Sequence, residues 1–254
     1  MILEVCVDSY ESLLTAKRAG ADRIELCSAL NLGGLTPSMG LMKKARELEG
    51  LEIFVMIRPR SGDFLYSEED YAVMKEDIRL VKALGFDGIV LGFLNAQGGI
   101  DLERTREAAE LAYPLKVAFH RAFDDARDPD KDLPALIDIG VIRILSSGQR
   151  ASALEGADYL ARLQREFGSR VTIMPGSGIT SSNIKEIVEL TGCSNYHMSG
   201  KLNRASAMVY RDYVKRMGTS EKEHVVEVAD FQRINEVKRI LDTMKGDSSL
   251  REDL

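Results

Sequence analysis

Eight times along this chain, a short apolar stretch typical of a β-strand is followed by a longer stretch typical of an α-helix. The predicted strands are residues 3–8, 23–27, 53–57, 88–93, 115–120, 143–145, 171–174 and 195–198. Strands that are joined through helices lie parallel to one another. Eight such units within 254 residues favour a closed sheet over an open, doubly wound one. The sequence therefore predicts an α/β fold of the TIM type, a (β/α)8 barrel with outer helices.

No linker or shift in composition divides the chain, so we expect residues 1–254 to form one domain. The barrel core should occupy residues 1–200. Residues 201–229 are polar and irregular by comparison and predict an excursion from the barrel. A final helix is expected over 230–245, where apolar residues recur on one stripe, and the tail 246–254 should fray.

Composition narrows the class of protein. Hydrophobic residues make up 44% and charged residues 29%, as is usual in soluble globular proteins. The net charge of −6 and the lack of a basic block speak against binding to nucleic acid or to a membrane surface. There is no apolar run of membrane-spanning length, and the first residues do not resemble a signal peptide. Three cysteines are too few for a disulfide framework, so we expect a cytoplasmic protein.

The first two predicted strands alternate in a way that fixes their faces. Apolar residues occupy one face of each strand and should pack against helices. The other face carries charge and sulfur, and in a barrel it points inward. Over all strands, the predicted interior contains Glu4, Cys6, Asp8, Arg23, Glu25, Cys27, Met56, Arg58, Lys116, His120, Arg143, Thr172, Met174, Asn195, His197 and Ser199.

This polar interior divides into two levels. Near the amino ends of the strands, charged groups must be paired, because an unpaired buried charge destabilises the fold by several kcal/mol. We expect a salt-bridge network there that fills the lower barrel and consists of Glu4, Arg23, Lys116 and Arg143. Near the carboxyl ends, where such barrels place their sites, a pocket is predicted. Its residues are Cys6, Glu25, Cys27, Arg58, His120 and His197.

Two predicted loops at the same end of the barrel have the composition of an anion site. Gly176, Ser177 and Gly178 follow the seventh strand, just ahead of a helix expected to begin near Thr180. Backbone amides in such a position bind anions. Ser199, Gly200 and Lys201 follow the eighth strand and add a positive charge. The alternative interpretation is that these glycines only permit tight turns.

Several longer motifs resemble the CutC family of copper homeostasis proteins. They are residues 4–9 (EVCVDS), 24–28 (IELCS), 33–38 (GGLTPS), 56–60 (MIRPR), 62–64 (GDF), 119–124 (FHRAFD) and 153–156 (ALEG). The resemblance covers about residues 1–200. It implies a TIM barrel, a cytosolic and often homo-oligomeric protein, and a proposed role in binding Cu(I). The family's proposed copper ligands correspond to Cys6 and Cys27 here.

The chemistry of the pocket is compatible with copper binding. Cu(I) is soft and accepts two thiolates in a near-linear arrangement, and neighbouring strands lie about 4.8 Å apart. Met56 and Met174 could add thioether contacts. Glu25 should raise the pKa of the thiols and oppose ligation unless a cation such as Arg58 offsets it.

The same pocket also permits an enzymatic hypothesis. Glu25 and His120 could act as general acid and base, and Arg58 could hold a carboxylate or phosphate. This set would suit an isomerase, epimerase or lyase that acts on a small anionic, possibly phosphorylated, metabolite. From the residues alone, a copper ion and a small anionic ligand both remain candidates.

Overall fold

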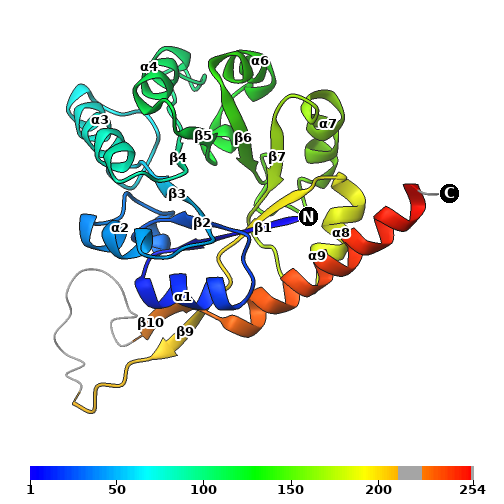
Figure 1. Cartoon of the computed structure of the whole chain (residues 1–254). Coiled ribbons are helices and arrows are strands. Elements are labelled where there is room, and N and C mark those ends of the chain that lie inside the picture. Colours follow the sequence, from blue (N-terminus) through cyan, green and yellow to red (C-terminus); the bar gives the residue numbers. More distant parts are fainter. Residues whose placement is uncertain (211–224, 253–254) are drawn as a thin grey trace.

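The computed structural model describes residues 1–210 and 225–252 of the chain. Eight strands form one sheet in the order β7-β6-β5-β4-β3-β2-β1-β8, in which all paired neighbours are parallel. This is the predicted TIM-type barrel (Figure 1). The strands are β1 (Ile2–Val7), β2 (Arg23–Leu26), β3 (Glu52–Met56), β4 (Gly88–Leu91), β5 (Lys116–Phe119), β6 (Val141–Ser146), β7 (Thr172–Pro175) and β8 (Asn195–Met198).

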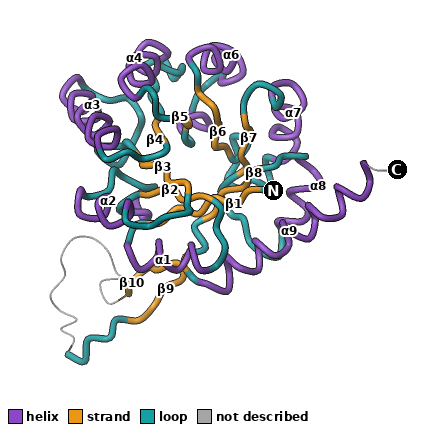
Figure 2. The backbone as a smooth tube through the Cα atoms, in the orientation of Figure 1, coloured by secondary structure: helices purple, strands orange, loops and turns teal. Residues whose placement is uncertain are grey.

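Helices surround the sheet, as Figure 2 shows by colour. They are α1 (Tyr10–Arg18), α2 (Met39–Arg46), α3 (Glu68–Ala83), α4 (Leu102–Ala112), α5 (Ala122–Asp125), α6 (Pro129–Ile139), α7 (Ala157–Phe167), α8 (Ile184–Thr191) and α9 (Phe231–Glu252), with the short 3-10 helix η1 (Leu30–Leu32) after β2. Within the described residues, no helix combines the length and the hydropathy that crossing a bilayer requires.

Helix starts follow from local hydrogen bonds. Ser67 caps α3 in a capping box with Asp70, since each side chain accepts from the other residue's backbone amide. Helix α8 begins at Ile184 and not near Thr180 as predicted. The reason is that the Asn183 side chain accepts from the Thr180 amide, which holds residues 180–183 in turns. The glycine loop after β7 is therefore separated from the helix.

The two faces of the strands enter different clusters, as their alternation predicted. Leu3, Val5 and Val7 of β1 belong to the large apolar core between the sheet and the helices. A second, smaller cluster fills the barrel interior and consists of Cys6, Cys27, Phe54, Met56, Val90 and Ala118. The interior of the barrel is thus sulfur-rich in its middle layer, between charged groups below and the open mouth above.

Residues 201–229 were predicted to form an excursion from the barrel, and regular structure occupies both ends of this stretch. Strands β9 (Lys201–Ala205) and β10 (Val225–Ala229) form an antiparallel ribbon that lies beside α1 (Figure 1). All of β9 is exposed, so it lacks the apolar alternation that marks a half-buried strand. Residues 211–224 of the predicted excursion lie outside the described part of the chain. The last helix, α9, runs on to Glu252, beyond the predicted end at residue 245.

Candidate functional site

Glu4 is the centre of the charged network in the lower barrel. Its carboxylate accepts from Arg23 Nε at 2.5 Å and from Arg143 Nη1 at 3.1 Å, and it lies 2.8 Å from His197 Nδ1. Burial alone would raise the pKa of Glu4. The hydrogen bond from His197 and the charges of both arginines outweigh burial and hold this pKa well below its ordinary value. The carboxylate is therefore ionised and fully paired.

Lys116 joins this network only at the rim, through Glu52, which also pairs with Arg23 at 3.4 Å; its predicted place in the barrel interior was wrong. Its side chain is half exposed and its Nζ pairs with Glu52 Oε1 at 2.7 Å, at the lower rim of the barrel. Lys116 is the first residue of β5, so its long side chain reaches out of the barrel's amino end. Phe54 takes the central space instead, with the Arg23 and Arg143 guanidinium carbons 5.8 and 4.4 Å from its ring centroid.

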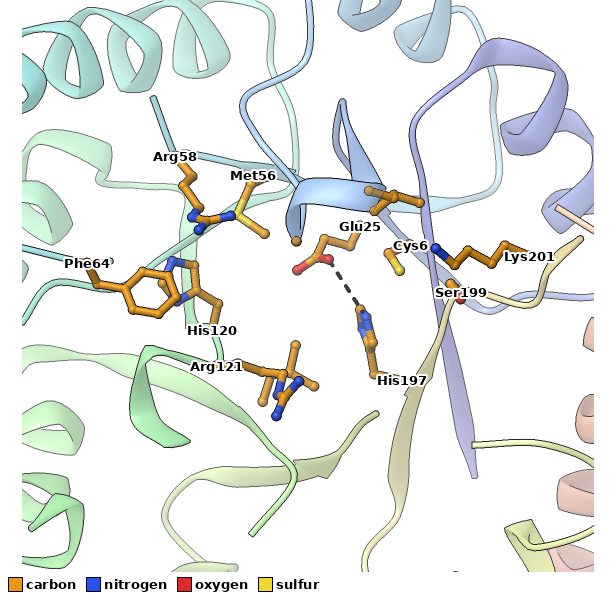
Figure 3. A pocket seen from close by; sticks show the side chains of 13 residues that line it. Cys6, Glu25, Met56, Arg58, Phe64, His120, Arg121, His197, Ser199 and Lys201 are labelled. Atoms are coloured by element: carbon orange, nitrogen blue, oxygen red, sulfur yellow. Dashed lines mark ion pairs between the residues drawn. The ribbon is translucent and has the colours of Figure 1, made fainter. Parts of the chain in front are cut away.

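Directly above Glu4, three potential metal ligands converge. The Cys6 sulfur, a Glu25 carboxylate oxygen and a His197 ring nitrogen all lie within 4.8 Å of one another, and all three residues are buried. Strand register explains this meeting, because Cys6 pairs with Glu25 across β1 and β2, and Glu4 pairs with His197 across β1 and β8. Figure 3 shows the Glu25–His197 contact, which measures 3.8 Å from Oε2 to Nε2.

His197 has its orientation set by Glu4. With Nδ1 bonded to the Glu4 carboxylate, Nε2 is the ring nitrogen that faces Cys6 and Glu25. Burial lowers the pKa of His197, but interactions with Cys6, with Glu25 and with Glu4 reverse this and raise the pKa well above its ordinary value. A carboxylate that bonds the far nitrogen of an imidazole is the usual support of a metal-binding histidine.

Cys27 shares the interior but stands at a different height. Because Cys6 pairs with Glu25, the Cys27 backbone lies two residues, about 6.6 Å, further along the strand direction. Its thiol is fully buried and donates to Glu25 Oε2 at 3.6 Å. Burial, followed by the nearby Glu25 and Cys6, raises the pKa of Cys27 well above its ordinary value. The Gly34 backbone packs against this sulfur, where an added Cβ would come within 3.2 Å.

A cavity of about 180 Å³ opens from the three-residue cluster toward the barrel mouth (Figure 3). Of the six residues predicted to form a pocket, five line it: Cys6, Glu25, Arg58, His120 and His197. Cys27 is absent from this lining and lies behind Glu25 and Gly34. Five of the six residues therefore lie around one cavity, and the Cys27 thiol is buried behind its lining.

His120 is held as a neutral ring. Its Nδ1 accepts from the Ala122 amide at 3.1 Å, which assigns the proton to Nε2. Burial and then the charge of Arg58 lower the pKa of His120 to about 3. The Phe64 ring packs against it with centroids 4.8 Å apart. At neutral pH, His120 thus presents one N–H donor and no charge.

Arg58 fastens the loops after β2 and β3. Its Nη1 donates to the carbonyls of Leu32 and Gly34, and its Nη2 donates to the carbonyl of Gly62. Its guanidinium also lies 5.0 Å from the centroid of the Phe64 ring. These bonds use much of the hydrogen-bonding capacity of Arg58. Its predicted role as an anion clamp, like the acid–base roles of Glu25 and His120, stays a prediction.

A wider vestibule of about 840 Å³ adjoins the cavity and shares Cys6 and His197 with its lining. It is lined by five of the six residues predicted to bind anions, namely Ser177, Gly178, Ser199, Gly200 and Lys201. Gly176 lies deeper, where a Cβ would come within 2.5 Å of the Leu145 side chain. Lys201 pairs with Glu227 at 3.0 Å, which offsets part of its charge. Anion binding at these loops stays a prediction.

With this geometry in place, comparison with known proteins identifies the family. The sequence profile of the CutC family matches residues 1–202. The chain belongs to the CutC family.

Individual CutC proteins are similar over most of the chain. A human protein named "Copper homeostasis protein cutC homolog" is 44% identical over 94% of this chain and 88% of its own length. A CutC protein of Chromobacterium violaceum is 47% identical over 86% of this chain and 89% of its own. The crystal structure of CutC from Streptococcus agalactiae is 32% identical, covers 78% of this chain and 98% of its own, and superposes with a TM-score of 0.75.

Sequence reasoning missed several residues that line the cavity of this CutC chain. Leu30 comes from η1, and Gly33, Phe64 and Arg121 come from loops; strand parity predicts none of their side-chain directions. Phe54 of the barrel interior is different, because it shares the parity of Met56 and the pattern could have identified it.

Proposed function

We propose that this CutC-family chain is a copper homeostasis protein that binds Cu(I) in the barrel interior, with Cys6 as its central ligand. The observation that carries the proposal is the convergence of Cys6, His197 Nε2 and Glu25 within 4.8 Å. Thiolate sulfur and imidazole nitrogen both suit copper. Cys27 remains the predicted second thiolate, since it is the nearest other soft donor on the adjoining strand.

The surroundings of the cluster support a soft cation. Glu4 holds His197 with Nε2 toward Cys6, so the imidazole is oriented before any ion arrives. Thiols bind metals as thiolates, so Cu(I) binding must release protons from the cysteines of the site. The burial of both thiols implies slow exchange of bound copper. The enzymatic alternative stays a prediction, since no contact described above favours a turnover step.

A competition titration with a colorimetric Cu(I) chelator tests this assignment. We expect the parent chain to retain Cu(I) and His197→Gln to bind it at least about tenfold more weakly, because the variant loses an oriented ligand. His120→Gln is the matched control, since it changes a buried histidine of the same cavity outside the metal cluster. Equal Cu(I) affinity in the parent chain and in His197→Gln would show that His197 is not a ligand.

We also propose that the protein resides in the cytoplasm. Its three cysteines are all free and buried, as is usual for thiols in a reducing compartment. Cell fractionation with an antibody against the chain tests this location.

A homo-oligomer is the assembly we propose, with the β9–β10 ribbon at the contact. The ribbon and its continuation expose apolar side chains, including Leu202, Val226, Val209 and Tyr210. Exposed apolar patches of this kind mark interaction surfaces. Light scattering after size exclusion should give a multiple of the 28.2 kDa chain mass, and Leu202→Arg with Val226→Arg should reduce it to one chain. A parent chain that is monomeric at all concentrations would contradict the assembly.

A further inference from the structure

One buried cation in the cavity wall lacks a counter-ion. The Arg58 side chain is 5% exposed, and its hydrogen bonds go to three backbone carbonyls. Across residues 1–210 and 225–252, no carboxylate oxygen lies within 4.0 Å of its nitrogens. Carbonyl dipoles solvate a guanidinium but do not neutralise it, and a buried charge without an opposite charge is strongly unfavourable. This wall therefore lacks one negative charge.

Two unpaired polar atoms lie on the same cavity. His120 Nε2 is a donor, because Nδ1 is the nitrogen that accepts from Ala122. Glu25 Oε1 is the oxygen left without a partner, because Oε2 accepts from Cys27, and in the ionised carboxylate Oε1 is an acceptor. Both side chains are 3% exposed, both line the cavity, and neither atom has a hydrogen-bond partner. Native proteins leave few buried polar atoms in this state, so each one needs an explanation.

These features have a common geometry. Figure 3 shows Arg58, Phe64 and His120 together on one side of the cavity, with the Glu25 carboxylate between them and His197. The donor and the unmatched positive charge thus lie together, and the Glu25 carboxylate lies between them and His197. Met56, Phe64 and Leu145 supply apolar surface to the same cavity.

We propose that this cavity binds a small monocarboxylate that carries a hydroxyl group. Its carboxylate accepts from His120 Nε2 and offsets the charge of Arg58, and its hydroxyl donates to Glu25 Oε1. The site goes beyond copper binding, since Arg58 and His120 take no part in the metal cluster and Glu25 contributes its other oxygen.

Size and charge select this ligand class over its competitors. A cavity of about 180 Å³ corresponds to about six water molecules, so it fits a carboxylic acid of a few carbon atoms. A phosphate monoester carries about two negative charges, whereas Arg58 is the one cation without a carboxylate partner among the described residues that line the cavity. Water alone would satisfy the donor and the acceptor but would leave the charge of Arg58 unbalanced.

Calorimetric titration of the parent chain with sodium L-lactate and sodium glycolate tests the proposal. Sodium acetate and inorganic phosphate at matched ionic strength complete the series. We expect both hydroxycarboxylates to bind and to raise the melting temperature. Acetate should bind about tenfold more weakly, because it lacks the donor for Glu25, and phosphate should not bind. The proposal is overturned if neither lactate nor glycolate binds. Phosphate that binds more tightly than these hydroxycarboxylates overturns the assigned ligand class.

Two variants separate this site from the copper site. His120→Gln should weaken hydroxycarboxylate binding at least about tenfold and leave Cu(I) retention unchanged. Cys6→Ser should lose Cu(I) retention and leave hydroxycarboxylate binding unchanged. If circular dichroism shows that His120→Gln is unfolded, the ¹⁵N resonance of His120 Nε2 in the parent chain replaces it. That resonance should shift on addition of lactate, and a resonance that does not move contradicts the contact. A parent chain that binds lactate but does not retain Cu(I) would refute the copper assignment alone.

Discussion

Replacing Cys6 and Cys27 together by serine should abolish Cu(I) retention in the chelator competition. Serine keeps the size and the hydrogen-bonding capacity of each side chain but removes the soft sulfur that Cu(I) requires. Both sites are small and buried, and serine fits each without a clash. The single variants resolve the two roles. Cys6→Ser should lose almost all binding, since Cys6 lies in the cluster with His197, and Cys27→Ser should lose less, since Cys27 is outside that cluster and two residues further along the strand direction.

Cys193→Ser is the matched control for this experiment. Cys193 is also a free, buried cysteine, but it belongs to the apolar core outside the barrel, after α8. It should retain Cu(I) as the parent chain does. A double variant that holds copper as tightly as the parent would show that neither barrel thiol is a ligand.

Glu4→Gln should lower the free energy of unfolding by about 3–5 kcal/mol, the usual effect of removing one partner from a buried ion pair. Glutamine preserves the shape of the side chain but leaves the charges of Arg23, Arg143 and His197 without their shared counter-ion. Urea unfolding at pH 7 measures the difference. Because the pKa of Glu4 is depressed, its stabilisation is complete above the unfolded pKa of about 4.3. The difference between parent and variant should therefore shrink as the pH falls through the folded pKa.

Glu52→Gln provides the comparison for this measurement. Glu52 also pairs with Arg23, and it pairs with Lys116, but its side chain is 30% exposed at the barrel rim. Ion pairs with access to water contribute about 0–1 kcal/mol, so the variant should lose no more than that. Equal losses in both variants would mean that burial does not govern the strength of this network.

The barrel and most of its interior follow from two periodicities in the sequence. Eight strand–helix alternations predicted the topology, and alternation within strands placed Cys6, Glu25 and His197 on the inner face. Such predictions succeed because both faces of a barrel strand are buried, so the polar face has no other environment than the interior.

Predictions weakened where the chain leaves the strands. Parity placed Lys116 inside, but its position as the first residue of β5 lets the side chain reach the rim and Glu52. Parity also put Cys6 and Cys27 on one face without giving their relative height, which depends on the register between β1 and β2. Register is a property of the assembled sheet and is not encoded in either strand alone. Phe64 and Arg121 approach the cavity from loops, where no periodicity applies.

Glu4 connects strands that are far apart in the chain. Arg143 lies on β6, 139 residues from Glu4 in the sequence. Arg143 and His197 of β8 both bond to the Glu4 carboxylate. A substitution at Arg143 would therefore act through Glu4 and disturb the support of the His197 imidazole. Inherited substitutions in this charged network would then weaken the metal site as the loss of a ligand would. A survey of natural variants restricted to the residues that line the cavity would overlook them.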